Sequence, residues 1–239
     1  RYKGEKMRDI ATKIYAANVT PLKDGALYNA AYYMATEERR KKTDGFRFER
    51  DRRLSVGAEL LLMKGLEEWG INPKEIKYYY GKNGKPCLAG KQDIYFNISH
   101  SGEAVICAVS LFEVGCDIEK VSDVNLKIAE RFFCEDEYEM IMSQKTEELK
   151  REMFFRLWTL KESFIKLTGM GIGMPMKSFS IKPDKDKIIV KQEHAFNACY
   201  FQELFLWKNY KCSVCGFDSS IGIKSGVSFE ILDFCDMLK

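Results

Sequence analysis

The amino-acid sequence predicts an α+β fold built of two similar halves, each a small sheet packed with helices. Strand and helix signals follow one another in the order strand, helices, strands, and then helices and strands again. Two five-residue stretches, VICAV at 105–109 and KCSVC at 211–215, resemble each other as corresponding strands would. With 46% hydrophobic and 31% charged residues, the 239-residue chain is long and apolar enough to bury a core. We place the boundary between the halves at 112/113, which gives domains 1–112 and 113–239.

The first half opens with an expected strand at 13–19, and an expected helix at 26–41 runs into a cluster of four basic residues. A second helix is better defined. Six apolar residues recur at spacings of three and four across 54–69, and Gly70 follows them as a stop signal. The strands expected after this helix are 76–80, 85–88, 94–99 and 104–110, with an Asn-Gly turn between the first two.

The second half opens with a strand at 114–119, in which apolar and polar residues alternate. The pattern then turns helical at 126–133, ahead of an acidic run. A long helix is expected at 147–168, and it stops at Gly169, because glycine suits the left-handed conformation that follows many helices. The short strands expected beyond it are 178–181, 187–191 and 211–216.

Bulk composition argues against several classes of protein. The 38 basic and 35 acidic side chains leave a net charge of +3, which by itself does not indicate a nucleic-acid partner. No apolar stretch is long enough to span a bilayer, and the charged first residues show no signal peptide. The eight cysteines lack framework spacing, which suits reduced thiols. We therefore expect a cytoplasmic protein that binds neither nucleic acid nor membrane.

The strand at 114–119 carries two carboxylates on one face. Because alternate side chains of a strand face opposite ways, Asp117 and Glu119 project together, away from the apolar residues. Two such acids repel each other unless a cation lies between them. A hard divalent cation such as Mg²⁺ takes oxygen ligands and leaves room for phosphate. The alternative is a half-exposed strand whose acids are simply solvated.

Glu162 and Lys166 form a second pair, four residues apart on one face of the long helix. Bulky neighbours (Trp158, Phe164 and Ile165) indicate that this part of the helix packs inside. A glutamate and a lysine held there would serve a metal ion and a phosphate, respectively. Glu before Lys at this spacing is also a common surface ion pair, so that interpretation stays open.

A third candidate is the stretch FNISHSG at 96–102, which ends a predicted strand. It combines small polar residues, His100 and a glycine in a predicted turn. Exposed backbone N–H groups, hydroxyls and an imidazole in one turn suit an anion. The alternative is a polar turn without a ligand.

These three stretches resemble a known family. FNISHSG at 96–102, GCDIE at 115–119 and WTLKESFIK at 158–166 match, in order and spacing, the signatures of surfactin-type phosphopantetheinyl transferases. GKP at 84–86 is similar to an upstream motif of that family. The resemblance covers roughly 13–216, nearly the whole chain.

The resemblance implies pseudo-symmetric halves with coenzyme A and Mg²⁺ in the cleft between them, and it assigns the site residues. Asp117, Glu119 and Glu162 would be the metal ligands. Glu162 and Lys166 would be the catalytic residues, with Lys166 on the pyrophosphate and Glu162 as general base. The residues implied to hold coenzyme A, besides Lys166, are Arg39, Lys42, Arg53, Lys85, Ser99 and His100.

The implied reaction joins a serine hydroxyl of an apo acyl or peptidyl carrier protein to the β-phosphate of coenzyme A and expels 3′,5′-ADP. Phosphoryl transfer of this kind requires mainly that the reacting groups are positioned and that the charge on the phosphates is neutralised. A monomer is expected, serving fatty-acid, polyketide or nonribosomal peptide biosynthesis. Leu54 stands where some relatives carry a phosphate-binding hydroxyl, so Ser55 would take that role only if the backbone shifted. A catalytically silent coenzyme A binder and a nucleic-acid module remain as alternatives from other classes.

The segment 125–133 is a candidate docking surface for the carrier, whose acidic helix is implied by the family resemblance. It follows the acidic strand, has more apolar residues than one core-facing stripe needs, and places Lys127 and Arg131 on one helix face. The alternative is an ordinary amphipathic helix that packs on its own domain.

Overall fold

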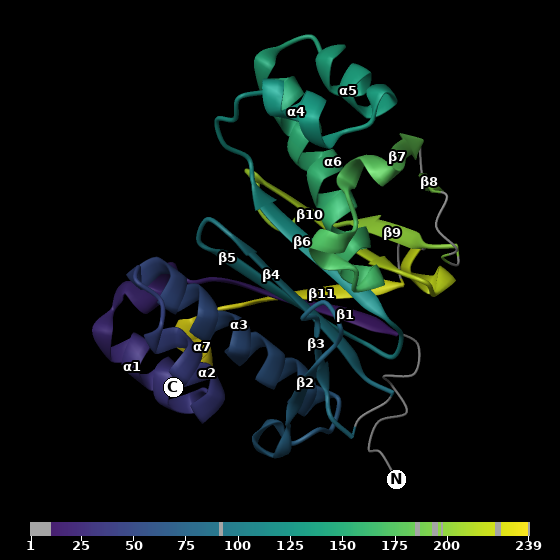
Figure 1. Ribbon diagram of the computed structural model, residues 1–239. Coiled ribbons are helices and arrows are strands. Elements are labelled where there is room, and N and C mark those ends of the chain that lie inside the picture. The colour runs from purple at the N-terminus through teal and green to yellow at the C-terminus, as the bar shows by residue number, and fades with distance from the viewer. Residues whose placement is uncertain are drawn as a thin grey trace.

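The computed structural model describes residues 11–90, 93–184, 187–192, 196, 198–222 and 226–238; the charged start of the chain lies outside them. Two halves, each with strands and helices, meet along their strands (Figure 1). The predicted α+β class with two similar halves is confirmed. Among the described residues, no helix has both the length and the apolar character needed to cross a membrane.

The first half is built on a four-stranded sheet. In it, β1 (Thr12–Asn18) is antiparallel to β5 (Ala104–Ser110), which is antiparallel to β4 (Tyr95–Ser101). The fourth strand, β11 (Val227–Leu232), was not predicted; it runs parallel to β1, and the sheet order is β11-β1-β5-β4. The range 113–239 expected for the second half therefore contributes one strand to the first sheet.

Two helices occupy the stretch predicted as one at 26–41. They are α1 (Gly25–Met34) and α2 (Glu37–Asp44). Thr36 between them is extended, and its hydroxyl accepts a hydrogen bond from the Arg39 N–H at 3.3 Å, so it caps the start of α2. The prediction of one helix was wrong because a threonine that caps a new helix ends the preceding one.

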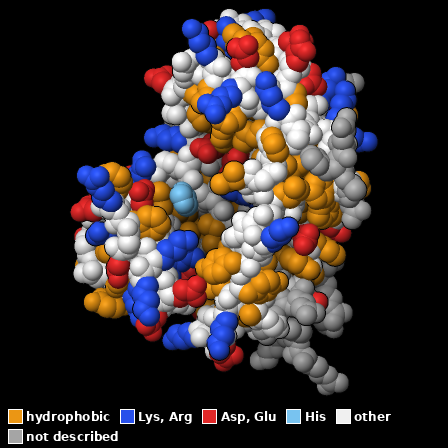
Figure 2. Space-filling view, viewed as in Figure 1, with side chains coloured by type: hydrophobic (Ala, Val, Ile, Leu, Met, Phe, Trp, Pro, Cys, Tyr) orange, Lys and Arg blue, Asp and Glu red, His pale blue; other side chains and the backbone are white. Residues whose placement is uncertain are grey.

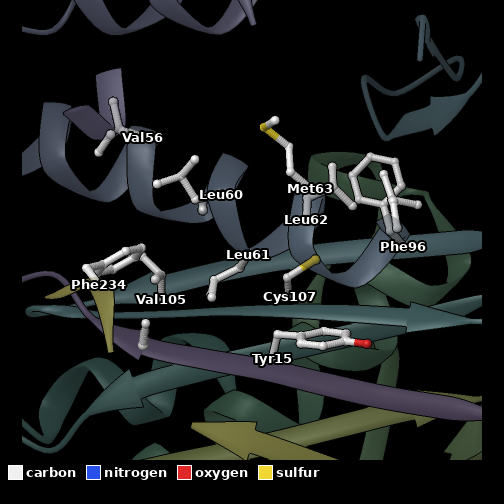
Figure 3. Packing of buried hydrophobic residues seen from close by; sticks show 14 of the residues in the cluster. Tyr15, Val56, Leu60, Leu61, Leu62, Met63, Phe96, Val105, Cys107 and Phe234 are labelled. Atoms are coloured by element: carbon white, nitrogen blue, oxygen red, sulfur yellow. The ribbon is translucent and has the colours of Figure 1, made fainter. Parts of the chain in front are cut away.

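The long helix α3 (Glu49–Glu68) lies across β1 and β5, as its apolar stripe predicted. Figure 3 shows Leu61 of α3 beside Val105 and Cys107 of β5, in a buried cluster that all three share. The helix ends just before Gly70, whose φ of 73° only glycine adopts readily.

The second half repeats this plan. Its sheet order is β6-β10-β9, all antiparallel, with β6 (Val114–Lys120), β10 (Tyr210–Gly216) and β9 (Tyr200–Glu203). The helix α6 (Glu147–Thr168) lies along β6 and β10 and ends at Gly169, with φ of 67°, as predicted. The two similar five-residue stretches lie in β5 and β10, the inner strands of their sheets.

Short hairpins and helices complete the described part of the chain. The remaining strands are β2 (Tyr78–Tyr80), β3 (Pro86–Leu88), β7 (Phe179–Asp184) and β8 (Lys187–Gln192), and the remaining α-helices are α4 (Lys127–Phe132), α5 (Glu135–Met142) and α7 (Phe234–Met237). The 3₁₀ helices are Thr20–Lys23, Pro73–Glu75, Gly171–Gly173, Met176–Ser178 and Ser219–Gly222.

The seam between the halves runs along β4 and β6, which lie side by side but belong to different sheets. Side chains of β4 supply part of the link. The Cys116 N–H donates to Asn97 Oδ1 at 2.9 Å, and the Lys120 N–H donates to Ser101 Oγ at 3.1 Å. Hydrogen bonds from two residues of one strand therefore fix β6, with its acidic side chains, against the first half.

Candidate active site

A cavity of about 710 Å³ opens at this seam, and the space-filling view shows the molecule hollowed there, with charged side chains of both signs nearby (Figure 2). It is lined from both halves: α2 and α3 contribute one wall, and β6 and α6 contribute another. A second cavity of about 570 Å³ adjoins it, because both are lined by Pro86, Ile98, Trp158, Glu162 and Lys166.

Asp117 is the centre of a buried polar group. It is only 3% exposed, and its Oδ1 accepts hydrogen bonds from Ser99 Oγ at 2.7 Å and from Lys166 Nζ at 2.6 Å. Lys166 Nζ also donates to Ser99 Oγ at 2.8 Å, so the three side chains form a closed triangle. Burial is the largest single effect on Lys166 and lowers its pKa. The charge and hydrogen bond of Asp117, together with the charge of Glu162 and an effect from Cys116, outweigh it, so the pKa is raised.

Glu119 lies two residues further along the same face of β6. Ser101 Oγ donates to Glu119 Oε2 at 2.6 Å. Burial raises the pKa of Glu119 to about 7; the Ser101 hydrogen bond opposes this effect and the charge of Asp117 adds to it. The predicted pairing of these two acids on one strand face is confirmed, and the solvated-strand alternative is wrong for Asp117.

Glu162 of α6 faces both cavities, and in the described part of the structure its carboxylate accepts no hydrogen bond. Burial raises its pKa, as does the charge of Asp117. Lys166, one turn later, pairs with Asp117 rather than with Glu162. The alternative of a simple surface ion pair between Glu162 and Lys166 is therefore wrong.

Gly115 explains how α6 comes so close to the acidic strand. A Cβ atom at Gly115 would lie 2.0 Å from the Ser163 carbonyl oxygen and 2.4 Å from the Leu167 nitrogen. Only a residue without a side chain allows this contact between backbones. The contact points are the immediate neighbours of Glu162 and Lys166, so the glycine fixes how far both side chains stand from β6.

Lys161, the neighbour of Glu162, was not assigned a role from the sequence. It is fully buried against the equally buried Glu137 of α5, with Nζ–Oε distances of 2.6 and 2.7 Å. Glu137 also accepts from the Ile181 N–H at 2.7 Å, and Lys161 donates to the Phe179 carbonyl at 2.6 Å. The pair thus ties α5, α6 and β7 together.

The basic wall of the larger cavity comes from α2. Arg39 and Lys42 both line it, as does His100 of β4. Arg39 is held by a 2.9 Å ion pair from its Nε to Glu59, whose side chain is fully buried. Burial lowers the pKa of His100, and the charge of Lys166 lowers it further.

Ser55 lines this cavity, whereas Leu54 is buried in the core of the first half. A hydroxyl at residue 55 therefore lines the cavity without any shift of the backbone. Asp51, one turn before Ser55, lines the cavity too and was also missed. Their four-residue spacing is followed three residues later by Ala58, which also lines the cavity, so a polar start to the helical stripe was the available signal.

Lys85 and Arg53 do not line the larger cavity. Lys85 Nζ donates to the Val114 carbonyl at 3.3 Å and the Leu167 carbonyl at 3.1 Å, and it lines the adjoining cavity. Burial lowers its pKa. Arg53 points into a separate cavity of about 200 Å³. The structure thus brings together Arg39, Lys42, Ser99, His100, Asp117, Glu119, Glu162 and Lys166.

The acids of the cleft determine whether a metal ion fits there. Among the described residues, no three acidic, histidine or cysteine side chains converge into a preformed metal cluster. Asp117 Oδ2, however, is buried without a hydrogen-bond partner, beside two further carboxylates of raised pKa. A Mg²⁺ site needs only one or two carboxylates when substrate phosphates and water supply the other ligands. The residues present fit such a site.

Fold and cleft together describe two α+β halves with basic and acidic side chains around one cavity between them. A family profile described as "4'-phosphopantetheinyl transferase superfamily" matches residues 113–215, and one described as "4'-phosphopantetheinyl transferase, N-terminal" matches residues 21–111. The two matches meet next to the predicted boundary.

Curated relatives agree with the family profiles. The chain is 37% identical to 4'-phosphopantetheinyl transferase gsp of Aneurinibacillus migulanus, with 77% of this chain and 76% of that protein covered. It is 33% identical to 4'-phosphopantetheinyl transferase Sfp of Bacillus subtilis (74% and 80% covered). It is 34% identical to the human L-aminoadipate-semialdehyde dehydrogenase-phosphopantetheinyl transferase (61% and 52% covered). The chain belongs to the 4'-phosphopantetheinyl transferase superfamily.

Proposed function

We propose that this enzyme transfers the 4′-phosphopantetheine group of coenzyme A to a serine of an apo acyl or peptidyl carrier protein and releases 3′,5′-ADP. The observation that carries the proposal is the buried triangle of Ser99, Asp117 and Lys166, at the junction of the two cavities. In the proposed complex the pyrophosphate of coenzyme A would lie at this junction, beside the Lys166 ammonium and the Asp117 Oδ2 that has no hydrogen-bond partner among the described residues.

Coenzyme A has two chemically different ends, and the two cavities differ in the same way. The larger one has Arg39, Lys42 and His100 in its wall, which suit the phosphates of the nucleotide end. The adjoining one is lined by apolar side chains such as Phe132, Ile165 and Met174, which suit the pantetheine arm. Residues 1–112 would thus bind mainly the nucleotide, and 113–239 would supply the acids and the carrier surface.

Asp117, Glu119 and Glu162 are the proposed Mg²⁺ ligands. The ion, when bound, neutralises charge on the pyrophosphate. Lys166 already contacts Asp117, so it can turn to the phosphates with little movement. In the proposed site it stabilises the charge that develops on the leaving 3′,5′-ADP, while Ser99 keeps Asp117 in place.

Glu162 is the proposed general base. The serine Oγ bonds to the β-phosphorus, the bond from that phosphorus to the oxygen shared with the α-phosphate breaks, and the serine proton passes to Glu162 directly or through water. A bound Mg²⁺ would make Glu162 a weaker proton acceptor than a free carboxylate, so transfer of the proton through a water suits this role.

The carrier is proposed to dock on α4, beside the apolar cavity. Phe132 of α4 lines that cavity and contacts Trp158 edge-on at 5.5 Å between ring centroids, while Ile128 is 40% exposed. Lys127 and Arg131 would orient an acidic carrier helix. Charge reversal of both should raise the KM for the carrier, more at low salt, and leave the KM for coenzyme A unchanged. Unaltered carrier kinetics would put the docking surface elsewhere.

We also propose that the enzyme acts as a monomer in the cytoplasm. None of its eight cysteines forms a disulfide, which fits a reducing compartment. Equilibrium sedimentation of the purified protein tests the oligomeric state.

The test of the function is incubation with coenzyme A, Mg²⁺ and a panel of apo carriers, followed by intact-protein mass measurement. One carrier should gain the mass of a single phosphopantetheine, and the same carrier with its acceptor serine replaced by alanine should gain none. Binding of coenzyme A without mass gain on any carrier would support the silent binder instead.

A further inference from the structure

Asn97 of β4 has a side-chain amide of which the protein uses only one end. The residue is 7% exposed and lines the adjoining cavity of about 570 Å³. Its Oδ1 accepts a hydrogen bond from the Cys116 N–H at 2.9 Å, which fixes the orientation of the amide and leaves Nδ2 as the other end. Among the described residues Nδ2 has no hydrogen-bond partner, and it is not one of the fully buried polar atoms that lack one. Its N–H groups are therefore accessible from the cavity.

The other donor side chains in the wall of this cavity already bind the protein. Asn83 Nδ2 donates to the Gly169 carbonyl at 3.0 Å, and the ammonium groups of Lys85 and Lys166 each donate two hydrogen bonds within the chain. A nearly buried amide donor is costly when nothing accepts from it. The amide of Asn97 thus indicates a ligand that offers an oxygen acceptor at this point of the wall.

The place of Asn97 on β4 indicates which part of the substrate it would meet. Asn97 and Ser99 lie on one face of the strand, two residues and therefore about 7 Å apart. Ser99 lines the larger cavity and belongs to the triangle where the pyrophosphate is proposed to lie, whereas Asn97 lines the adjoining cavity. In coenzyme A the pantoyl unit, with one hydroxyl and one amide carbonyl, directly follows the β-phosphate. Its oxygens are the first uncharged acceptors of the arm.

We propose that Asn97 Nδ2 donates a hydrogen bond to the pantoyl unit of the phosphopantetheine arm, which makes Asn97 a binding residue for the group that is transferred. This inference rests on the proposed function. It predicts that Asn97 adds affinity for coenzyme A but none for the product 3′,5′-ADP, because 3′,5′-ADP has the nucleotide and lacks the arm. The same amide would link the two halves through Oδ1 and the substrate through Nδ2.

The test is calorimetric titration with coenzyme A and, separately, with 3′,5′-ADP, at the same concentration of Mg²⁺. Damage to the seam or to the nucleotide site alters both affinities, so the ratio of the two Kd values isolates the arm. Asn97→Ala removes the whole amide. In Asn97→Ser a hydroxyl can still accept from the Cys116 N–H, but the side chain is one bond shorter and cannot also reach the arm. The matched control is Asn83→Ala, which removes an amide whose nitrogen is already used, and urea denaturation shows that each variant folds.

Wild-type protein should bind both ligands. In both Asn97 variants the ratio of the Kd for coenzyme A to the Kd for 3′,5′-ADP should rise about fivefold, the contribution of one neutral hydrogen bond. In Asn83→Ala the ratio should stay within about twofold. Equal weakening of both ligands would show that Asn97 serves only the seam and would overturn this inference alone, as would unchanged binding of both. Wild-type protein that does not bind coenzyme A would refute the proposed function together with the inference.

Discussion

Replacing Gly115 by alanine tests how strictly the active site depends on the packing of α6 against β6. Cβ atoms do not approach other atoms closer than 3.0 Å, and the Ser163 oxygen would stand at 2.0 Å, so α6 must move by about 1 Å. The obstacles are backbone atoms, which cannot rotate away. Overpacking of this kind costs up to about 3 kcal/mol in the free energy of unfolding. A displacement of about 1 Å in a catalytic group also lowers turnover about 100-fold.

Urea denaturation measures the first effect, and carrier modification at saturating coenzyme A measures the second. Gly173→Ala is the matched control, because it lies in the same half and its new Cβ would meet nothing within 4 Å. We expect that variant to resemble the wild-type protein in both assays. A Gly115→Ala variant with wild-type stability and turnover would refute the argument that this contact sets the position of Glu162 and Lys166.

Further predictions concern the acids and the lysine. Asp117→Ala should abolish transfer and leave the fold intact, as circular dichroism would show; near-normal turnover at limiting Mg²⁺ would contradict its assignment as a ligand. Glu162→Gln should lower kcat far more than coenzyme A affinity, whereas Lys166→Ala should impair both, and steady-state kinetics with a binding titration separates them. In the metal-free protein, burial raises the pKa of Glu119 to about 7 from 4.5, so the folded state keeps a proton that the unfolded chain loses. The stability contributed by that proton is complete below pH 4.5 and is lost as the pH rises through 7, and a Glu119→Gln variant should lack this slope in urea titrations from pH 4 to 8.

Local patterns were enough to predict the elements that carry the acids. The alternation in 114–119 and the helical stripe with its terminal glycine correctly predicted β6 and α6. Once the strand and the helix are predicted, the faces on which Asp117 and Glu162 lie are predicted as well, because the period of each element decides which residues share a face. Asp117 and Lys166 were both predicted as site residues, but their contact was not. This contact depends on how α6 lies on β6, which local patterns do not report.

Long-range pairing and exact register could not be predicted in this way. The strand β11 alternates in burial, but its partner β1 lies at the other end of the chain, and no local signal reports that contact. In α3, a choice between Leu54 and Ser55 depends on a rotation of about 100° per residue, which only the packed helix settles. For the same reason Arg53 was assigned to the nucleotide although it faces the small cavity.

The stretch at 96–102 shows most clearly what tertiary structure adds. It was interpreted as a turn that offers its groups to an anion, but β4 extends to Ser101, so residues 97, 99 and 101 share one face. All three bond to the acidic strand: Asn97 to the backbone of residue 116, Ser99 to Asp117, and Ser101 to Glu119. The small polar residues that recur at every second position of β4 thus form a row of hydrogen bonds across the seam. These bonds position the two carboxylates of β6. Because Asp117 and Glu119 are each held by a residue of the other half, the geometry of this pair exists only when both halves are docked.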